Sequence, residues 1–214
     1  MKYVTIPVTP FQQNCSLIWC EATKEAAVID PGGNVERIIE RIEKEQLTLT
    51  MILLTHGHID HVGGAKALAD LTGVDIIGPH KDDEFWLENL PKQSQNFGFA
   101  ATEAFVPHRY LEQDDLLHVG HQQLKVLHCP GHTPGHVVFH HQASQLAWVG
   151  DVIFRGSIGR TDFPGSSHAD LIASITQRLW PLGNDVTFVP GHGPISTVGE
   201  ERKHNPFVAD QLLD

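Results

Sequence analysis

Residues 55–61, with the sequence THGHIDH, hold three histidines and one aspartate, and they directly follow an apolar run of four residues. Such a short run, bounded by a polar turn, is typical of a strand buried inside a sheet. In an extended loop, side chains two positions apart point the same way, so His56 and His58 can bind one metal ion together. Asp60 and His61 are left to bind a neighbouring ion. The segment therefore predicts metal ligands at the end of a buried strand.

The same arrangement of a buried strand and a polar segment recurs along the chain. Short apolar runs lie at residues 51–54, 124–127 (with Lys125 inside it), 146–149 and 186–189. The segments after them read THGHIDH, HCPGHTPGH, GD and PGHGP. Glycine alone would satisfy a tight turn, so the repeated His and Asp residues need another explanation. Because loops beyond strand ends form the crevice in sheets covered by helices, we expect these side chains to meet at one site.

A helix is predicted over residues 34–46, where apolar side chains recur with the spacing i, i+3, i+4 and i+7. Asn34 is its candidate N-cap. The apolar positions are Val35, Ile38, Ile39 and Ile42. A helix lying on buried strands indicates an α/β protein. All candidate ligands lie between residues 56 and 192, so residues 1–214 are expected to form a single catalytic domain.

Two further segments have less regular patterns. Residues 89–113 combine Pro, Gly and aromatic residues without a clear period, which predicts a long irregular loop. Within it, Phe97 and Phe99 either cover the site or pack against the core. Residues 200–206 are expected to contribute a short helix near the C-terminus.

The polar segments together supply two complete sets of metal ligands. His132 and His192 each lie beside Gly and Pro residues that hold a turn, and Asp151 follows a predicted strand. The carboxylate of Asp151 can bridge two ions, as carboxylates do in dinuclear sites. The first ion would bind His56, His58, His132 and Asp151, and the second Asp60, His61, Asp151 and His192. Imidazole and carboxylate ligands suit two divalent ions, zinc above all, although iron or manganese would be tolerated.

Such a pair of ions predicts hydrolytic chemistry. Two ions about 3.5–4 Å apart share a water and lower its pKa from about 15.7 to about 7, so a hydroxide bridging the two metal ions becomes the nucleophile. Asp60 is the candidate catalytic residue, because it can orient this hydroxide and carry its proton. A thioester substrate would need no strong general acid, since a thiol of pKa about 8.5 leaves readily as thiolate. Cys129, close to His132, is interpreted as a small buried residue.

Composition limits the compartment and the partners. The net charge of −11 argues against binding to nucleic acid through its phosphates. The three cysteines form no even disulfide framework and fit a reducing compartment. The chain has neither a signal-peptide pattern at its start nor the roughly 20 consecutive apolar residues of a membrane span. A cytoplasmic protein without a membrane partner is expected, and a monomer is compatible with this, although the sequence leaves the oligomeric state open.

The order HxHxDH, GHTPGH, GD and PGHGP resembles the metallo-β-lactamase superfamily, which implies a four-layer αββα sandwich. Within it, residues 11–15, 30–33, 150–154 and 159–163 resemble the type II glyoxalases, or hydroxyacylglutathione hydrolases, and especially a short bacterial form without the C-terminal helical domain. This resemblance implies the seven metal ligands at matching positions. It also implies hydrolysis of S-D-lactoylglutathione to D-lactate and glutathione, a step of methylglyoxal detoxification.

The resemblance extends to one substrate contact. In the longer glyoxalases, a basic residue contacts glutathione at the position where this chain has Arg160. The guanidinium can form two parallel hydrogen bonds with a carboxylate, so we expect Arg160 to bind a glutathione-derived thioester. A surface salt bridge is the alternative role for this side chain. The longer enzymes also grip glutathione with basic residues of a helical extension, for which residues 1–214 leave no room.

Other functions remain possible on the same residues. An iron-dependent persulfide dioxygenase of the superfamily would use His56, His132 and Asp151 as a facial triad, and His192 favours the hydrolase over it. A β-lactamase or an RNA-processing nuclease is disfavoured by the missing signal peptide and by the acidic composition. A metal store is the alternative that is not an enzyme, but ligands that leave room for a bridging water are a poor design for inert binding.

Overall fold

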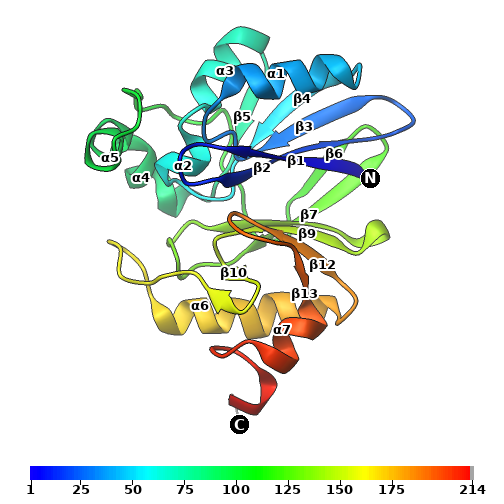
Figure 1. Cartoon of the computed structure of the whole chain (residues 1–214), viewed down its shortest axis with the longest axis vertical. Helices are drawn as coiled ribbons and strands as arrows, with labels where there is room; N and C mark the ends of the chain where they lie inside the picture. Colours follow the sequence, from blue (N-terminus) through cyan, green and yellow to red (C-terminus); the bar gives the residue numbers. More distant parts are fainter. Residues whose placement is uncertain (213–214) are drawn as a thin grey trace.

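The chain folds into four layers, in the order helices, sheet, sheet and helices (Figure 1). This computed structural model describes residues 1–212. The first sheet has the strand order β1-β2-β3-β4-β5. Its strands are β1 (Lys2–Val8), β2 (Gln13–Trp19), β3 (Glu25–Ile29), β4 (Thr48–Leu53) and β5 (Asp75–Ile77). The pairs β1–β2 and β2–β3 are antiparallel, while β3–β4 and β4–β5 are parallel.

The second sheet lies against the first and has the order β13-β12-β9-β8-β7-β6. Its strands are β6 (Leu116–Val119), β7 (Gln122–His128), β8 (Val137–His141), β9 (Leu146–Gly150), β12 (Thr187–Pro190) and β13 (Ser196–Thr197). Only β9 and β12 pair in parallel among these strands. The remaining strands, β10 (Ile153–Phe154) and β11 (Ser157–Ile158), form a small ribbon of their own.

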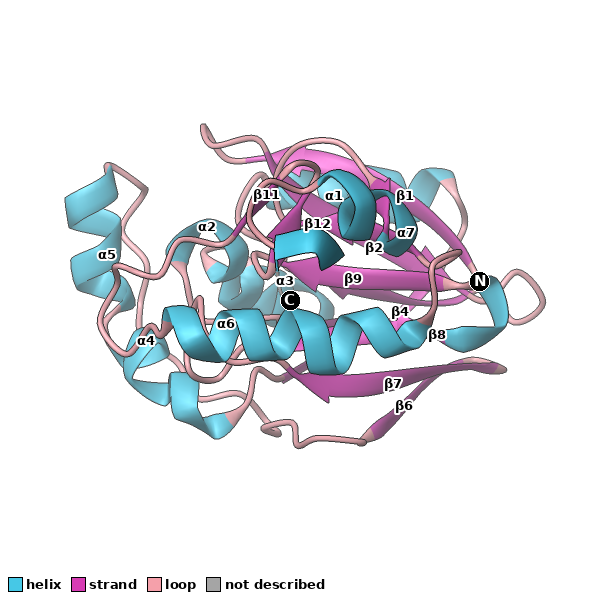
Figure 2. Ribbon diagram, turned by 90° about the horizontal axis from the view of Figure 1, so that it is seen from below, coloured by secondary structure: helices cyan, strands magenta, loops and turns pink. Residues whose placement is uncertain are grey.

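Helices cover the outer face of each sheet and one end of the sandwich (Figures 1 and 2). The first sheet carries α1 (Val35–Lys44) and α3 (Ala65–Thr72). The second carries α6 (His168–Ser174), which continues as a π-helix (Ile175–Leu179) and a 3₁₀ turn (Trp180–Leu182), and α7 (Val198–His204). At one end lie α2 (Ile59–Val62), α4 (Glu84–Glu88) and α5 (Leu90–Phe97). Three short 3₁₀ turns complete the structure: Lys81–Asp83, Gln142–Ser144 and Asp210–Leu212.

Three apolar cores separate the four layers. In β3, Ala26 and Val28 pack with side chains of α1 and α3, while Ala27 and Ile29 pack between the two sheets. Strands β8 and β9 alternate in the same way between the inter-sheet core and the core under α6. Because both faces of these strands are covered, most of their side chains are apolar. This explains the apolar runs in the sequence, and it confirms the expected αββα sandwich.

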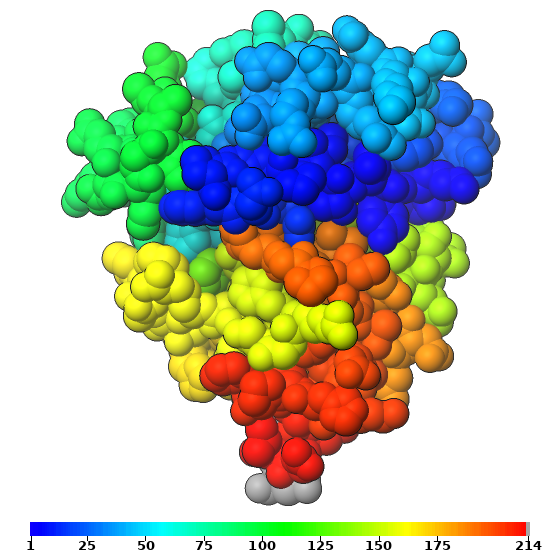
Figure 3. Space-filling view, in the orientation of Figure 1, coloured from blue at the N-terminus to red at the C-terminus, as the bar shows by residue number. Residues whose placement is uncertain are grey.

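The strand directions bring the polar segments together. β7 is antiparallel to β8, β8 is antiparallel to β9, and β9 is parallel to β12. Hence β7, β9 and β12 all run the same way, and the loops after them emerge at one edge of the second sheet. The first sheet contributes the loop after β4 to the same end, where α2 lies (Figure 1). Figure 3 shows the halves of the chain, coloured blue to green and yellow to red, meeting across the molecule.

The predicted elements are largely present. Helix α1 and strands β4, β7, β9 and β12 lie at the predicted places with ends shifted by a few residues, and α7 occupies the expected C-terminal helix. Asn34 occupies the predicted N-cap position of α1, but its side chain makes no capping hydrogen bond. Its Oδ1 instead accepts a hydrogen bond from the backbone N–H of Thr9, at 2.8 Å. The side chain joins the β1–β2 turn to the helix, a contact between segments far apart in sequence.

The prediction of a loop over residues 89–113 is wrong in its first part, which forms α5. Its eight residues are too few to show a helical period, and Pro91 lies in the first turn, where a missing N–H is tolerated. Gly98 ends the helix in the left-handed conformation, at φ 70°. Residues 98–113 are irregular as expected. None of the helices that the structure describes in residues 1–212 is long and apolar enough to span a membrane.

Candidate metal centre and active-site cleft

Seven predicted ligands come from four separate loops at this end of the sandwich. His56 and His58 lie on the loop after β4, whereas Asp60 and His61 lie on the single-turn helix α2 that begins directly after His58. The others follow β7, β9 and β12 in turn and are His132, Asp151 and His192. The structure brings all seven together, although 136 positions separate the first from the last (192 − 56).

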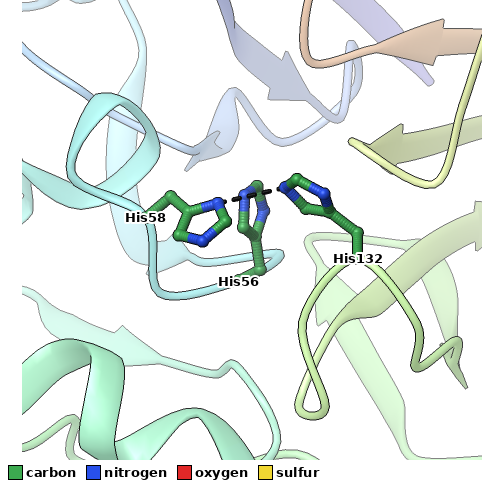
Figure 4. A group of neighbouring side chains, drawn as sticks. All are labelled: His56, His58 and His132. Atoms are coloured by element: carbon green, nitrogen blue, oxygen red, sulfur yellow. Dashed lines mark hydrogen bonds between the residues drawn. The ribbon is translucent and has the colours of Figure 1, made fainter. Parts of the chain in front are cut away.

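His56, His58 and His132 form the first group of potential ligands, with one nitrogen of each within 4.8 Å of the others (Figure 4). Nδ1 of His58 lies 3.0 Å from Nε2 of His132. His132 donates its Nδ1–H to the backbone carbonyl of Arg160, at 2.8 Å, which leaves a lone pair on Nε2. Nδ1 of His56 donates to the hydroxyl of Thr55, at 3.0 Å, and leaves its own Nε2 free. The free nitrogens therefore face one another in the tautomers that a metal needs.

Asp60, His61 and His192 form the second group. His192 directs Nδ1 to the backbone carbonyl of Phe11, at 3.2 Å, so its Nε2 carries the lone pair in the neutral ring. This Nε2 lies 3.0 Å from Oδ2 of Asp60, and Nε2 of His61 lies 3.8 Å from the same oxygen. A lone pair and a carboxylate oxygen repel at this separation unless a proton or a cation lies between them.

Asp151 lies between the two groups. Its Oδ1 is 3.3 Å from Nε2 of His61, and its Oδ2 is 3.7 Å from Nε2 of both His132 and His192. Burial alone would raise the pKa of Asp151, but the adjacent imidazole of His61 and the other histidines hold this pKa below its ordinary value. The carboxylate is thus ionised and within reach of both sets of ligands, as a bridging ligand must be.

The residues fit the metal ions that this ligand pattern requires. Nε2 of His56, Nε2 of His61 and Oδ1 of Asp151 are buried and make no hydrogen bond to any residue in the range 1–212. An unpartnered buried polar atom costs about 1–3 kcal/mol, and metal coordination removes that cost. Burial also lowers the pKa values of His56 and His58, which favours the neutral imidazole that binds metals.

This arrangement corresponds to a known family. A family model described as the metallo-beta-lactamase superfamily matches residues 8–192, a range that includes every predicted ligand. The chain belongs to the metallo-beta-lactamase superfamily. The membership confirms the resemblance that the four motifs indicate, and the expected fold with it.

Four similar proteins cover nearly the whole chain. Hydroxyacylglutathione hydrolase GloC of Haemophilus influenzae is 48% identical over 97% of this chain and 98% of its own. The B3 metallo-beta-lactamase BLEG-1 has 37% identity and a TM-score of 0.89, over 97% and 99% of the two chains. TTHA1623, solved in a di-iron-bound form, has 34% identity and a TM-score of 0.87, over 96% and 100%. ETHE1 from Myxococcus xanthus has 26% identity and a TM-score of 0.81, over 98% and 85%.

These similarities confirm that the chain is a metal-dependent hydrolase of the superfamily and that it resembles the short glyoxalase II-like form. They leave the metal open, since one similar structure carries two irons. ETHE1, at 26% identity, is more distant from this chain than the hydrolase GloC, at 48%.

Asp30 orients ligands of both groups, and reasoning from the sequence did not assign it a role. Its carboxylate accepts hydrogen bonds from the backbone N–H of Thr55 at 2.7 Å, the hydroxyl of Thr55 at 2.6 Å and Nδ1–H of His61 at 2.9 Å. Thr55 in turn accepts from His56. One buried carboxylate therefore selects the tautomers of His56 and His61 in this superfamily member. The position after a buried strand, β3, was the signal available in the sequence.

Asp83 and Gln93 fix the loop after β4, which carries His56 and His58, by hydrogen bonds to its backbone. Asp83 accepts hydrogen bonds from the N–H groups of Gly57, at 2.8 Å, and Gly135, at 2.6 Å, and from the hydroxyl of Thr133, at 2.8 Å. Its carboxylate thereby joins the loop after β4 to the loop after β7. Gln93 accepts from the N–H of Ile59, at 3.0 Å, and donates to the carbonyl of Gly57, at 3.2 Å. Neither side chain belongs to a motif, so only the folded chain reveals these contacts.

His136 packs against two of the predicted ligands, His56 and Asp151. Its ring stacks on that of His56, with centroids 4.6 Å apart and an interplanar angle of 16°. Its Nε2 accepts the backbone N–H of Asp151, at 3.1 Å. Gly150 makes this approach possible, because a Cβ there would lie 2.6 Å from Nε2 of His136. Cys129 is fully buried, and burial raises the pKa of its thiol to about 12, which agrees with its interpretation as a small core residue.

A cleft of about 810 Å³ opens over the predicted ligands. Phenylalanine and tryptophan side chains form much of its apolar wall, and Asp60, Asp151 and His192 are among the polar residues that line it. The aromatic residues are Phe11, Phe85, Trp86, Phe97, Phe154 and Phe163. Clefts of this size with a few convergent polar groups are typical of small-molecule sites.

The two phenylalanines that the sequence left undecided have different environments. Phe97 lines the cleft and is 47% exposed, and its ring meets that of Phe11 edge to face with centroids 6.4 Å apart. Phe99 is partly buried and packs against the core of the first sheet. The covering role therefore suits Phe97, and the packing role suits Phe99.

Arg160 also lines the cleft, as expected for a substrate contact. Its guanidinium already forms two hydrogen bonds with Asp162, from Nε at 2.6 Å and from Nη2 at 2.7 Å. The same guanidinium lies over the ring of Phe163, 4.4 Å from the centroid. The alternative role, a surface salt bridge, is thus present, while contact with the substrate stays a prediction.

Proposed function

We propose that this protein hydrolyses S-D-lactoylglutathione to D-lactate and glutathione, and so acts as a thioesterase in methylglyoxal detoxification. The observation that carries the proposal is the position of Asp151, within 3.7 Å of ligands from two groups. A mononuclear site would need only one group. The 48% identity to a hydroxyacylglutathione hydrolase supports the choice of substrate.

Two metal ions would be held by the seven ligands, the first by His56, His58, His132 and Asp151 and the second by Asp60, His61, Asp151 and His192. We propose zinc for both ions, with iron or manganese as substitutes, because imidazole and carboxylate ligands suit all three. When bound, the ions supply a water of lowered pKa as nucleophile and a Lewis acid that polarises the thioester carbonyl.

Asp60 is the proposed catalytic residue. Burial would raise the pKa of its carboxyl, but the neighbouring His61 and His192 lower this pKa below its ordinary value, so the group is ionised at neutral pH. Asp60 also lines the cleft, where its carboxylate can accept a proton and orient the attacking water. The thiolate of glutathione leaves without a proton donor, since the pKa of a thiol is about 8.5.

The surroundings of the centre suit a small anionic thioester. Arg160 lines the cleft, keeps one guanidinium nitrogen outside its pair with Asp162, and would contact the glutathione part. Both halves of the chain supply ligands, so we propose that residues 1–214 act as one catalytic domain. The three cysteines are all unpaired thiols, which supports a cytoplasmic location.

The test is the loss of absorbance of S-D-lactoylglutathione with purified protein, after loading with zinc, iron or manganese in separate samples. We expect turnover, with two ions bound per chain. The same samples are offered glutathione persulfide while oxygen uptake is recorded, and a chromogenic β-lactam. Oxygen uptake with one iron per chain and no thioester hydrolysis would favour the dioxygenase, and β-lactam hydrolysis alone would favour the lactamase. Either result refutes the thioesterase.

A further inference from the structure

Two cationic side chains line the cleft, and they differ in how far their charge is already neutralised. They are Lys92 and Arg160. Arg160 is engaged by both carboxylate oxygens of Asp162 and by the face of Phe163. By contrast, Lys92 has no carboxylate within 4.0 Å among residues 1–212 and is exposed. In a protein of net charge −11, Lys92 is therefore the free cation of the cleft.

Lys92 belongs to a polar stripe on α5 that faces the cleft. Asn89 precedes it by three positions and Asn96 follows it by four, and all three residues line the cleft. This is the spacing of neighbours on one helix face. Asn89 donates its side-chain N–H to the carbonyl of Phe85, at 2.7 Å, so its amide is held in place one helical turn before the lysine. An ammonium group flanked by two amides is a suitable partner for a carboxylate.

The stripe is also rigidly connected to the metal centre. Gln93, the residue after Lys92, is buried and hydrogen bonds to Ile59 and Gly57, which flank the ligand His58. A third hydrogen bond joins Gln93 to the carbonyl of Trp86, at 2.8 Å. A substrate anchored on the stripe would therefore be held at a constant position relative to Asp60, one residue beyond Ile59.

We propose that Lys92, with Asn89 and Asn96, binds a carboxylate of the thiol part of the substrate. This inference rests on the proposed function. The lactoyl group of that substrate is small and uncharged, whereas glutathione carries two carboxylates. Arg160, already paired, leaves one of them without a full counter-charge. Lys92 is then a specificity residue for thioesters of an acidic peptide thiol, and it takes no part in the bond cleavage itself.

The experiment compares two substrates in Lys92→Met, Lys92→Arg and the native protein. One substrate is S-D-lactoylglutathione, and the other is the lactoyl thioester of N-acetylcysteamine, a thiol without carboxylates. For Lys92→Met we expect a five- to tenfold higher KM with the glutathione thioester, kcat within twofold, and no change with the neutral thioester. Lys92→Arg should restore most of the affinity. Lys44→Met, on the exposed side of α1, is the matched control and should alter neither substrate.

Several outcomes would overturn the inference. Equal increases in KM for both substrates would indicate that Lys92 only supports the structure, and unchanged constants would show that it does not contact substrate. If the native protein hydrolyses neither thioester, the proposed function fails. Calorimetric titration with glutathione then decides the inference by itself. Weaker binding to Lys92→Met than to Lys44→Met supports the anion site, and equal affinities reject it.

Discussion

Oδ2 of Asp30 lies 2.9 Å from Nδ1 of His61, and this contact determines which ring nitrogen of the imidazole is available to a metal. A carboxylate accepts only, so Nδ1 must carry the proton and Nε2 must carry the lone pair. That Nε2 is buried 3.3 Å from Asp151 and makes no hydrogen bond within residues 1–212. The tautomer of a predicted ligand is thus selected by a carboxylate outside the predicted ligand set.

Asp30→Asn should weaken metal binding while leaving the fold intact. The amide can present its N–H to Nδ1 of His61, which would invert the tautomer, and it removes the negative charge that makes the imidazole more basic. Loss of such supporting carboxylates typically lowers metal affinity about 10- to 100-fold. Competition with a chromophoric chelator measures the change. Asp70→Asn, at an exposed carboxylate paired with Lys66, is the control; equal affinities in the two variants would contradict the assigned role.

Gly191→Ala should disrupt the bridging position. A Cβ on Gly191 would lie 2.1 Å from Oδ1 of Asp151 and 2.5 Å from Cε1 of His61, so both side chains must move. We expect kcat/KM to fall at least about 100-fold, because an ångström-scale displacement of catalytic groups has effects of that size. Bound metal, counted by atomic emission, should drop below two ions per chain.

Gly193→Ala is the matched control for this substitution. A Cβ there meets nothing within 4 Å, but its φ of +76° is unfavourable for alanine. We expect about 1–2 kcal/mol of lost stability in urea unfolding, with the metal content retained. If the two variants behave alike, the geometry at Asp151 is not the cause.

Asp60→Asn should preserve the fold and lower kcat by about 10²- to 10⁴-fold. The amide keeps the size of the side chain, but it cannot accept the proton of the attacking water. Turnover is measured at saturating metal, because Asp60 is also a proposed ligand of the second ion. Circular dichroism and metal content of the same sample separate misfolding and metal loss from lost proton transfer. Near-normal turnover would refute the role.

The stability of the folded protein should depend on pH through the carboxyl group of Asp83. Burial raises the pKa of its carboxyl to about 6 in the folded protein, although three hydrogen bonds act in the opposite direction. Its unfolded value is about 3.9, so the folded state binds the proton more tightly. The stability from this group is present below about pH 4 and is lost as pH rises to about 6, by roughly 3 kcal/mol.

The measurement is urea unfolding of metal-free protein from pH 4 to pH 7. Asp83→Asn lacks this titration, so the native protein should lose stability relative to the variant across the interval. Asp82→Asn, at the exposed neighbouring residue, should instead follow the native curve. Parallel curves for the native protein and Asp83→Asn would show that the carboxyl of Asp83 has an ordinary pKa.

The candidate metal ligands could be found in the sequence because they are local in it. Residues 55–61 carry four of them, and each of the others lies beside a glycine directly after a strand. Buried strands appear in the sequence as apolar runs, so the end of each strand can be located and the His and Asp residues that follow it can be recognised as candidate ligands. The helix α5 could not be read in the same way, because eight residues with a proline in the first turn show no period.

What the sequence by itself determined is the chemistry: imidazoles and carboxylates at strand ends, an α/β fold and a hydrolase of the metallo-beta-lactamase superfamily. Only the tertiary structure decided which side chains orient and surround that chemistry. Asp30, Asp83 and Gln93 form hydrogen bonds with partners 25 to 52 positions away, and such contacts leave no periodic or compositional pattern in the sequence. Likewise, the pairing of Arg160 and the freedom of Lys92 depend on which neighbours the folded chain places beside them.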